Sequence, residues 1–467
     1  MKSARGLAAC ALLVSLACGA LPAEPDLPDL RRGQKAAEAG NIAEAERDLV
    51  PLAQMGYLAA QVSLAGLYAQ SEDPKTLEKA VHWFRVAASQ DGSVMVPLAR
   101  VLLKLNEPAT FAEAEKFLRD ADRKGDARAL AALLEFYTDH PDRDGNIKGG
   151  VKGLVARAEK KDSPELEGPL VRWYRKNSAG EGATKALVER CAKARDRIPE
   201  CYVDLARYYR ARGDRKALDK LVADAPKRLS AGALSPVIYE RLAWSLVSES
   251  QPGEPQPETA YPMLKRIMET SPTALVRVAR LQVEYPHLDP QANPEKLLLS
   301  ALAQGSSDAA LALGRLYLNG NRVVADPVKA ERYLREASAT EPAAHYYLGR
   351  IYKRGELGVA DPERGAAHLL TAARGGYARA DYLLAQLFSD NRGVKPNRLN
   401  AWVFATIAAK NGVAEANAMA GALRAGLSAQ ERQRADHVLQ EELVFRARAQ
   451  QQAMQQQQAE VSPGVVR

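Results

Sequence analysis

A short pattern that recurs about every 35 residues constrains this 467-residue chain more than any other feature. The pattern is Leu, a small residue, one variable position, an apolar residue and then usually Tyr or Phe. Clear copies begin at residues 64, 313, 348 and 384, and degenerate copies begin at residues 98, 133, 170, 205, 242, 278 and 419. Successive copies start 34 to 37 residues apart. A near-constant step over most of a chain is typical of a repeat array.

Each copy of the pattern is typical of one amphipathic helix in a two-helix hairpin. Its apolar positions are spaced i, i+3 and i+4, so they share one helical face. Before the second helix, Asp326-Pro327 and Asp361-Pro362 supply an N-cap acceptor followed by proline. One hairpin cannot bury its apolar face alone, so neighbouring hairpins must stack. We therefore predict an all-α fold, a right-handed α-solenoid of about eleven helix-turn-helix repeats.

Two clear copies contain predicted packing residues and predicted surface residues. The packing residues are Leu313, Gly314, Tyr317, Leu348, Gly349 and Tyr352. The candidates for surface contact are Tyr346, Arg350, Lys353 and Arg354. Aromatic rings can stack on sugars. The second group therefore favours contact with an acidic polysaccharide or with another protein.

The N-terminal residues resemble an export signal. A basic end precedes an apolar core, residues 7–16, that is too short to span a bilayer. Ser15-Leu16-Ala17-Cys18 then resembles a lipoprotein cleavage box. Residues 1–17 are accordingly predicted to be a signal peptide, Cys18 to carry lipid, and residues 18–30 to form a tether. The alternative is ordinary cleavage a few residues later, which gives a soluble periplasmic protein.

Two cysteines remain in the body of the chain, Cys191 and Cys201. They flank a predicted turn at residues 197–199, and such a hairpin can bring helix ends within bonding distance. Export places them in an oxidising compartment, where a disulfide persists. We predict a structural disulfide, with two buried free thiols as the alternative. The spacing is not that of a C-x-x-C redox pair.

The sequence carries no recognisable catalytic motif. Its six histidines are scattered and match neither H-E-x-x-H nor a zinc spacing, and G-x-S-x-G and phosphate-loop motifs are absent. His345 and His368 lie on successive predicted helices and could meet, with a structural role favoured over a metal site. The formal net charge of +8 is spread evenly, without the dense basic run that nucleic acid requires. The sequence predicts a non-enzymatic protein with no metal or cofactor and no nucleic-acid partner.

The better copies of the pattern resemble known repeat families. Leu313–Tyr317, followed by Lys329-Ala330 and Tyr333, is similar to the Sel-one-like subtype of tetratricopeptide-related repeats. More narrowly, residues 346–355 and 387–401, residues 53–57, and the pair of body cysteines resemble the AlgK family of alginate-biosynthesis lipoproteins. This resemblance spans nearly the whole mature chain.

The resemblance implies a location and partners. It implies the periplasmic face of the outer membrane, with the outer-membrane alginate porin AlgE and the periplasmic acetylation protein AlgX as partners. The implied function is a scaffold that supports the porin and organises the export of a polyanionic polysaccharide. The alternative is a module that binds the acidic polysaccharide itself.

The quality of the repeats predicts five segments in the mature chain. N-terminal repeats occupy residues 31–125, degenerate tetratricopeptide-like repeats residues 126–300, and Sel-one-like repeats residues 301–425. A capping helix at residues 426–449 follows. Residues 450–467 are predicted to be a disordered Gln-rich tail, with extension of the helix as the alternative.

Overall fold

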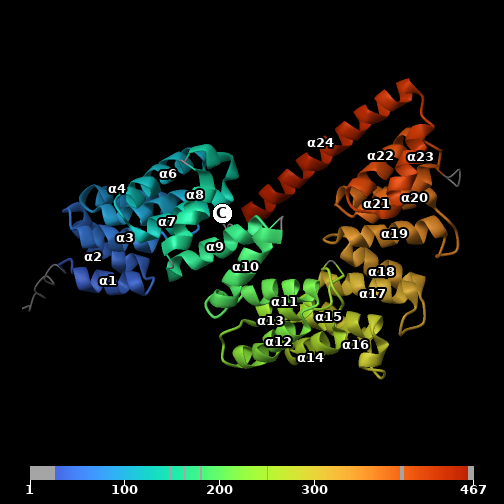
Figure 1. The fold of residues 1–467 in the computed structure, drawn as a ribbon, viewed down its shortest axis with the longest axis horizontal. Coiled ribbons are helices and arrows are strands. Elements are labelled where there is room, and N and C mark those ends of the chain that lie inside the picture. Colours follow the sequence, from blue (N-terminus) through green and yellow to red (C-terminus); the bar gives the residue numbers. More distant parts are fainter. Residues whose placement is uncertain are drawn as a thin grey trace, which may run out of the picture. The chain divides into compact units, whose positions relative to one another are not determined.

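The computed structural model describes residues 27–146, 149–161, 163–178, 181–249, 251–389 and 394–460. These residues form 24 α-helices and three short 3-10 helices, without a strand among them (Figure 1). The prediction of an all-α repeat fold is therefore confirmed. The predicted signal peptide and Cys18 lie outside the described residues. None of the described helices combines the length and the apolar character that crossing a membrane requires.

The chain divides into two compact units, with the main boundary after Pro169. The helices of the first unit are α1 (Leu30–Glu38), α2 (Ile42–Gln54), α3 (Leu58–Tyr68), α4 (Pro74–Gln90), η1 (Gly92–Val94), α5 (Met95–Lys104), α6 (Pro108–Arg123), α7 (Ala127–Asp139), η2 (Pro141–Asn146) and α8 (Gly150–Lys161). Helix α9 (Pro164–Lys176) contains the boundary.

The second unit contains the remaining helices. They are α10 (Glu181–Ala194), α11 (Cys201–Arg212), α12 (Arg215–Ser230), α13 (Pro236–Ser245), α14 (Pro257–Ile267), α15 (Pro272–Glu284), η3 (Pro286–Leu288), α16 (Pro294–Ala303), α17 (Ser307–Asn319), α18 (Pro327–Ala337), α19 (Pro342–Arg354), α20 (Pro362–Arg374), α21 (Ala378–Ser389), α22 (Arg398–Lys410), α23 (Ala414–Ala425) and α24 (Ala429–Glu460).

The eleven copies of the pattern fall on the odd-numbered helices from α3 to α23, here called A-helices. The even-numbered helices that follow them are the B-helices, and hairpins such as α3–α4, α17–α18 and α19–α20 pack closely. Helices α1 and α2 form one more pair ahead of the first copy. A Cβ atom on Gly33 would lie 2.7 Å from the side chain of Leu49, so Gly33 occupies the small position. The pattern misses this pair because little more than the small residue is kept. Arg32, which pairs with buried Asp48 at 2.6 Å, replaces the leading Leu, and Lys35 replaces the apolar residue.

The small residue of the pattern permits close contact between the two helices of a hairpin. A Cβ atom on Gly314 would lie 2.5 Å from Cγ of Leu334, and one on Gly349 would lie 2.7 Å from Cγ of Leu369. Real Cβ atoms do not approach side chains so closely, because dense interiors leave no room for added volume. The leading residues, Leu313 and Leu348, are fully buried beside these glycines.

The tyrosine that ends the pattern is an interior residue with a partner for its hydroxyl. In four copies this hydroxyl donates a hydrogen bond to a glutamate on the preceding B-helix. The pairs are Tyr68–Glu46, Tyr137–Glu115, Tyr317–Glu295 and Tyr352–Glu331. A buried tyrosine needs such a partner. The structure thus places Tyr317 and Tyr352 in the core, where they are 5% and 4% exposed.

The last helix is longer than predicted. Helix α24 continues to Glu460, so the expectation of disorder is wrong for residues 450–460, and the alternative of a helix extension holds there. Gln, Ala and Met are good helix formers, and neither Gly nor Pro interrupts residues 429–460.

A buried arginine fixes the middle of α24 to the repeats. Arg446 donates hydrogen bonds to the carbonyl oxygen of Ala373 at 3.1 Å and to the carboxylate of Asp381 at 2.7 Å. Arg374 of α20 pairs with Glu442 of α24 at 2.8 Å. Helix α24 therefore closes the end of the repeat stack, because its charged side chains satisfy groups that the last repeats bury.

Candidate binding groove on the A-helices

The position that the pattern leaves variable forms a row of arginines in the second unit. Its occupants in α11, α13, α15, α17 and α19 are Arg207, Trp244, Arg280, Arg315 and Arg350. This position lies two residues after the buried leading residue, and therefore on the opposite side of the helix. All five side chains are exposed or half-buried. Because repeats stack in register, equivalent positions of successive A-helices form a continuous surface.

We name part of this surface the arginine–aromatic groove. It consists of Trp244, Arg277, Arg280, Arg315, Tyr346, Tyr347 and Arg350, from α13, α15, α17 and α19. At one end, the guanidinium groups of Arg277 and Arg280 lie 5.1 and 4.9 Å from the centre of a Trp244 ring. These cation–π contacts hold α15 against α13.

The two arginines beside Trp244 also form ion pairs. Arg277 pairs with Glu240 at 3.1 Å, and Arg280 pairs with Glu284 at 3.3 Å. Burial lowers the pKa of Arg277, and the carboxylate of Glu240 partly opposes that effect. This end of the groove is therefore largely neutralised.

At the other end, the arginines lie on tyrosine rings. The guanidinium of Arg315 is 5.6 Å from the centre of the Tyr347 ring, and that of Arg350 is 5.7 Å from the same ring. Neither Arg315 nor Arg350 has an ion pair within the described part of the chain. The ring of Tyr346 lies 4.8 Å from that of Tyr377, whose pKa burial raises to about 12. These rings hold the guanidinium groups in place but leave their charge available.

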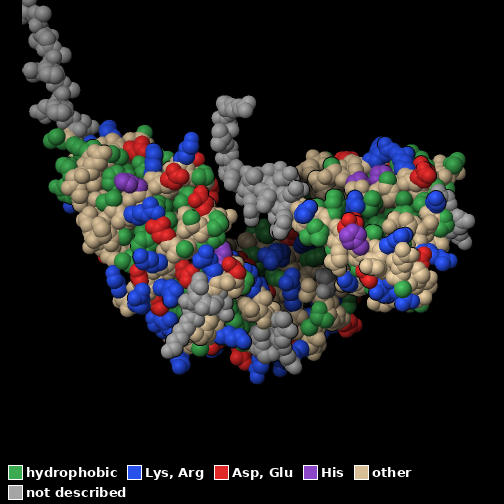
Figure 2. Space-filling model, turned by 90° about the horizontal axis from the view of Figure 1, so that it is seen from above, with side chains coloured by type: hydrophobic (Ala, Val, Ile, Leu, Met, Phe, Trp, Pro, Cys, Tyr) green, Lys and Arg blue, Asp and Glu red, His purple; other side chains and the backbone are tan. Residues whose placement is uncertain are grey.

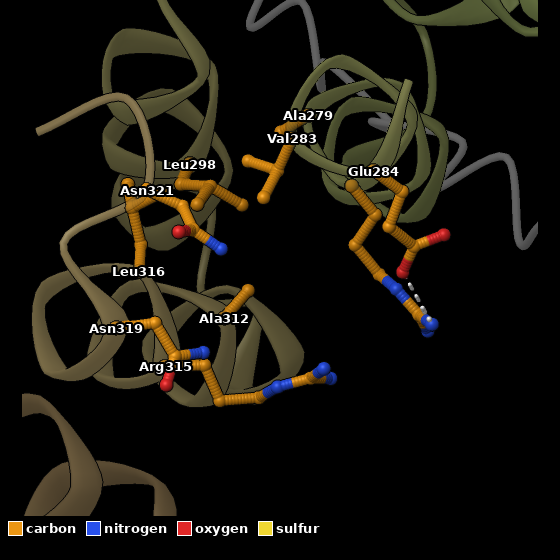
Figure 3. Close-up of a pocket in the computed structure, with 10 residues that line it drawn as sticks. Ala279, Val283, Glu284, Leu298, Ala312, Arg315, Leu316, Asn319 and Asn321 are labelled. Carbon is orange, nitrogen blue, oxygen red and sulfur yellow. Dashed lines mark hydrogen bonds and ion pairs between the residues drawn. The ribbon is translucent and has the colours of Figure 1, made fainter. Parts of the chain in front are cut away.

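Two adjoining cavities open along the groove. The larger has a volume of about 330 Å³ and the smaller about 170 Å³, and both are lined by Arg280, Ala312 and Arg315. In the larger cavity, Val283 and Leu298 lie close together on an apolar wall, whereas Arg315 extends from α17 away from them (Figure 3). An apolar wall beside a few polar groups is the usual composition of a ligand site.

Charge over the molecular face drawn in Figure 2 is mixed. In Figure 2, Lys and Arg side chains are interspersed with Asp and Glu side chains over the face in view. Such a surface is ordinary for a folded protein.

The structure separates the four residues predicted for surface contact. Tyr346 and Arg350 belong to the groove. Lys353 and Arg354 lie at the end of α19, where half-buried Lys353 packs beside Gly365 and Arg354 pairs with Glu356 at 3.6 Å. Four groove residues were not predicted from the sequence: Trp244, Arg277, Arg280 and Arg315. Arginine at the variable position of several copies was the signal that could have revealed Arg280 and Arg315. No such signal marks Trp244 or Arg277.

Cys191 and Cys201 form a disulfide in the structure, with their Cα atoms 5.0 Å apart. It joins the B-helix α10 to the next A-helix, α11. These two cysteines and Asp204 form the one cluster of three potential metal ligands among the described residues. Because the two sulfur atoms are bonded to each other, they offer no thiolate to an ion. His345 and His368 also meet, with their Nδ1 atoms 2.8 Å apart.

Stacked helical hairpins with an exposed groove along their A-helices define a tetratricopeptide-like repeat protein. Residues 183–268 match the AlgK tetratricopeptide repeat domain. Residues 58–92, 307–339, 342–377 and 378–413 match the Sel1 repeat. A solved structure of a protective antigen from uropathogenic Escherichia coli with an SLR fold is 20% identical and covers 92% of this chain and 97% of that chain, with a TM-score of 0.40.

Three curated relatives match over almost their full length, and each bears the name alginate biosynthesis protein AlgK. The relative from Pseudomonas syringae pv. tomato is 34% identical over 92% of both chains. That from Pseudomonas aeruginosa is 34% identical over 94% of this chain and 92% of its own. That from Azotobacter vinelandii is 32% identical over 98% of both. The chain belongs to the AlgK family.

Proposed function

We propose that this chain is a non-enzymatic scaffold that mediates protein–protein interactions in an alginate biosynthesis and secretion complex. The observation that carries the proposal is similarity to the AlgK relatives over 92% or more of this chain. Stacked repeats support it physically, because they present an extended surface on which several partners can dock. The sequence also carries none of the H-E-x-x-H, G-x-S-x-G or phosphate-loop motifs.

The proposal includes a location and two partners. The chain is exported, acylated at Cys18 and held on the periplasmic face of the outer membrane. There it supports the outer-membrane alginate porin AlgE and contacts the periplasmic acetylation protein AlgX. The lipoprotein-like box Ser15–Cys18 supports the anchor, and residues 18–30 would separate the lipid from α1.

Co-purification tests the scaffold function. The full chain with a C-terminal tag is crosslinked in intact alginate-secreting cells and purified from the detergent-solubilised envelope. The porin and the acetylation protein should be recovered with it, and deletion of the gene should abolish polymer secretion. Recovery of neither protein, combined with normal secretion by the deletion strain, would contradict the proposal.

Substitution of the acylation site tests the anchor. Cys18→Ser should abolish palmitate incorporation and move the chain from the membrane pellet to the soluble periplasm. Cys10→Ser is the matched control, because Cys10 lies within the predicted leader and should be removed with it. Palmitate labelling that persists in Cys18→Ser would rule out this anchor.

A further inference from the structure

The arginine–aromatic groove has features that a purely protein-binding scaffold does not require. Arg280, Arg315 and Arg350 occupy the same pattern position in three successive A-helices. Helices α15, α17 and α19 pack side by side. Packed helices lie about 8–10 Å apart, so the groove presents guanidinium groups at a regular interval.

The groove also holds donors that the protein leaves unused. Arg315 and Arg350 stack on Tyr347 and lack an ion pair within the described part of the chain. The guanidinium groups of Arg315 and Arg350 are therefore suited to an external anion, and planar guanidinium groups favour carboxylates in particular.

The acidic groups around the groove limit what it can attract. Glu240 and Glu284 neutralise Arg277 and Arg280 in part, and exposed Asp308 lines the smaller cavity. The net positive charge is therefore concentrated at the α17–α19 end, at Arg315 and Arg350. A ligand that follows the groove would meet its strongest charge contacts at that end.

We propose that the arginine–aromatic groove binds a polyuronate, an acidic polysaccharide with one carboxylate on each sugar. Its carboxylates pair with Arg315 and Arg350, and its sugar rings lie against the accessible parts of Trp244 and Tyr347. A polymer with evenly spaced carboxylates matches arginines that repeat once per hairpin, and flat aromatic surfaces suit sugar rings better than they suit an acidic peptide. The inference rests on the proposed function, because alginate is such a polymer.

Titration of the purified mature chain with alginate oligomers of defined length tests the proposal. The double variant Arg315→Gln and Arg350→Gln should bind at least tenfold more weakly than the wild type at moderate salt. The matched control is Arg432→Gln with Arg434→Gln, which removes the same charge from exposed positions on α24 and should retain wild-type affinity. Unchanged melting temperatures should show that both variants fold.

Three outcomes would overturn the assignment. Equal affinity of the groove variant and the wild type would place any binding elsewhere. Equally tight binding of a poly-glutamate peptide of the same charge would indicate an acidic peptide or general charge attraction. Equally tight binding of a neutral oligosaccharide of the same length would show that the carboxylates do not contribute to binding.

Partner recovery separates this inference from the proposed function. If the groove variant still co-purifies with the porin and wild-type protein does not bind alginate oligomers, the polyuronate site is wrong and the scaffold function stands. If alginate oligomers bind in the groove, no partner is recovered and the deletion strain secretes polymer normally, the site is supported and the scaffold function is wrong.

Discussion

The regular hairpin α17–α18 and the degenerate region from α10 to α14 each contain an equivalent backbone hydrogen bond. Different side chains, however, hold the two regions together. In the regular hairpin the amide of Asp326 donates to the carbonyl oxygen of Tyr317 at 3.0 Å. In α13–α14 the amide of Gln256 donates to the carbonyl oxygen of Leu246 at 2.9 Å. Both bonds close the loop at the end of the pattern. The backbone geometry of the repeat therefore survives where the sequence pattern has degenerated.

The side chains that support this geometry differ. The regular hairpin relies on the contact of Gly314 with Leu334. In the degenerate region, buried Arg210 of α11 donates hydrogen bonds to four carbonyl oxygens around the Pro-rich loop before α14, those of Ser245, Ser248, Gly253 and Glu254. The disulfide then joins α10 to α11. Specific polar and covalent links thus replace the repeated packing contact.

Among the changes that test this comparison, removal of Arg210 should lower the free energy of unfolding most. In Arg210→Met the four carbonyl oxygens lose their donor, so the free energy of unfolding of the second unit should fall by about 3 kcal/mol. Arg207→Met is the control, because Arg207 is exposed on the same helix. Urea unfolding and hydrogen exchange of residues 245–257 measure the change. Equal stability of the two variants would show that Arg210 does not hold the loop.

Removal of the disulfide should have the next largest effect. In the double variant Cys191→Ser and Cys201→Ser, the loss of a crosslink over a ten-residue separation should cost about 2–3 kcal/mol. The wild type in reductant should match the variant, and reductant should leave the variant unchanged. Identical unfolding curves for oxidised wild type and variant would contradict a stabilising crosslink.

In the regular hairpin, a bulky residue in place of glycine should be slightly less damaging. Gly314→Leu should lower the free energy of unfolding by about 2 kcal/mol, because the new side chain would force Leu334 and the two helices apart. Gly66→Leu is the matched control, because a Cβ atom at Gly66 has no neighbour within 4 Å. Calorimetric melting measures both. Similar melting temperatures for both variants would contradict the assignment of Gly314 to a close contact between helices.

The smallest effect concerns the histidine pair between α19 and α20. Burial lowers the pKa of both histidines, and that of His368 falls to about 4, with the charge of His345 as a further cause. Below about pH 6.5 the unfolded chain therefore binds protons that the folded chain does not. The neutral pair makes its full contribution to the free energy of unfolding above about pH 6.5, and this contribution declines as the pH falls toward about 4. The partial solvent exposure of the pair limits the loss to about 1 kcal/mol.

The variant His368→Gln should abolish that part of the acid sensitivity. Its free energy of unfolding relative to the wild type should rise as the pH is lowered from 7 to 4.5. His437→Gln, at an exposed position on α24, should follow the wild type over the same range. Parallel pH profiles of the wild type and His368→Gln, measured by urea unfolding, would disprove the role of the pair.

The hairpins themselves could be predicted from the sequence because their signals are local. The spacing of the pattern gave the A-helices, and the Asp-Pro pairs gave the start of B-helices. Asp326 accepts hydrogen bonds from the amides of Val328 and Lys329, and Asp361 from that of Arg364, as predicted. The first pair, α1–α2, escaped because Arg32 and Lys35 replace the two apolar residues on which the pattern depends. Helix α24 was misjudged because composition alone does not separate a polar helix from a disordered segment.

The sequence by itself determined that this chain is built of helical hairpins, where the hairpins from α3 onward lie, and that the glycines and tyrosines of the clear copies lie inside. These properties follow from helical periodicity and caps within about 35 residues of chain. Only the tertiary structure decided that Trp244 contacts Arg280 and that Arg315 shares the ring of Tyr347 with Arg350. Those contacts join different repeats, and the rotation of one repeat on the next depends on packing across the whole interface rather than on any local pattern.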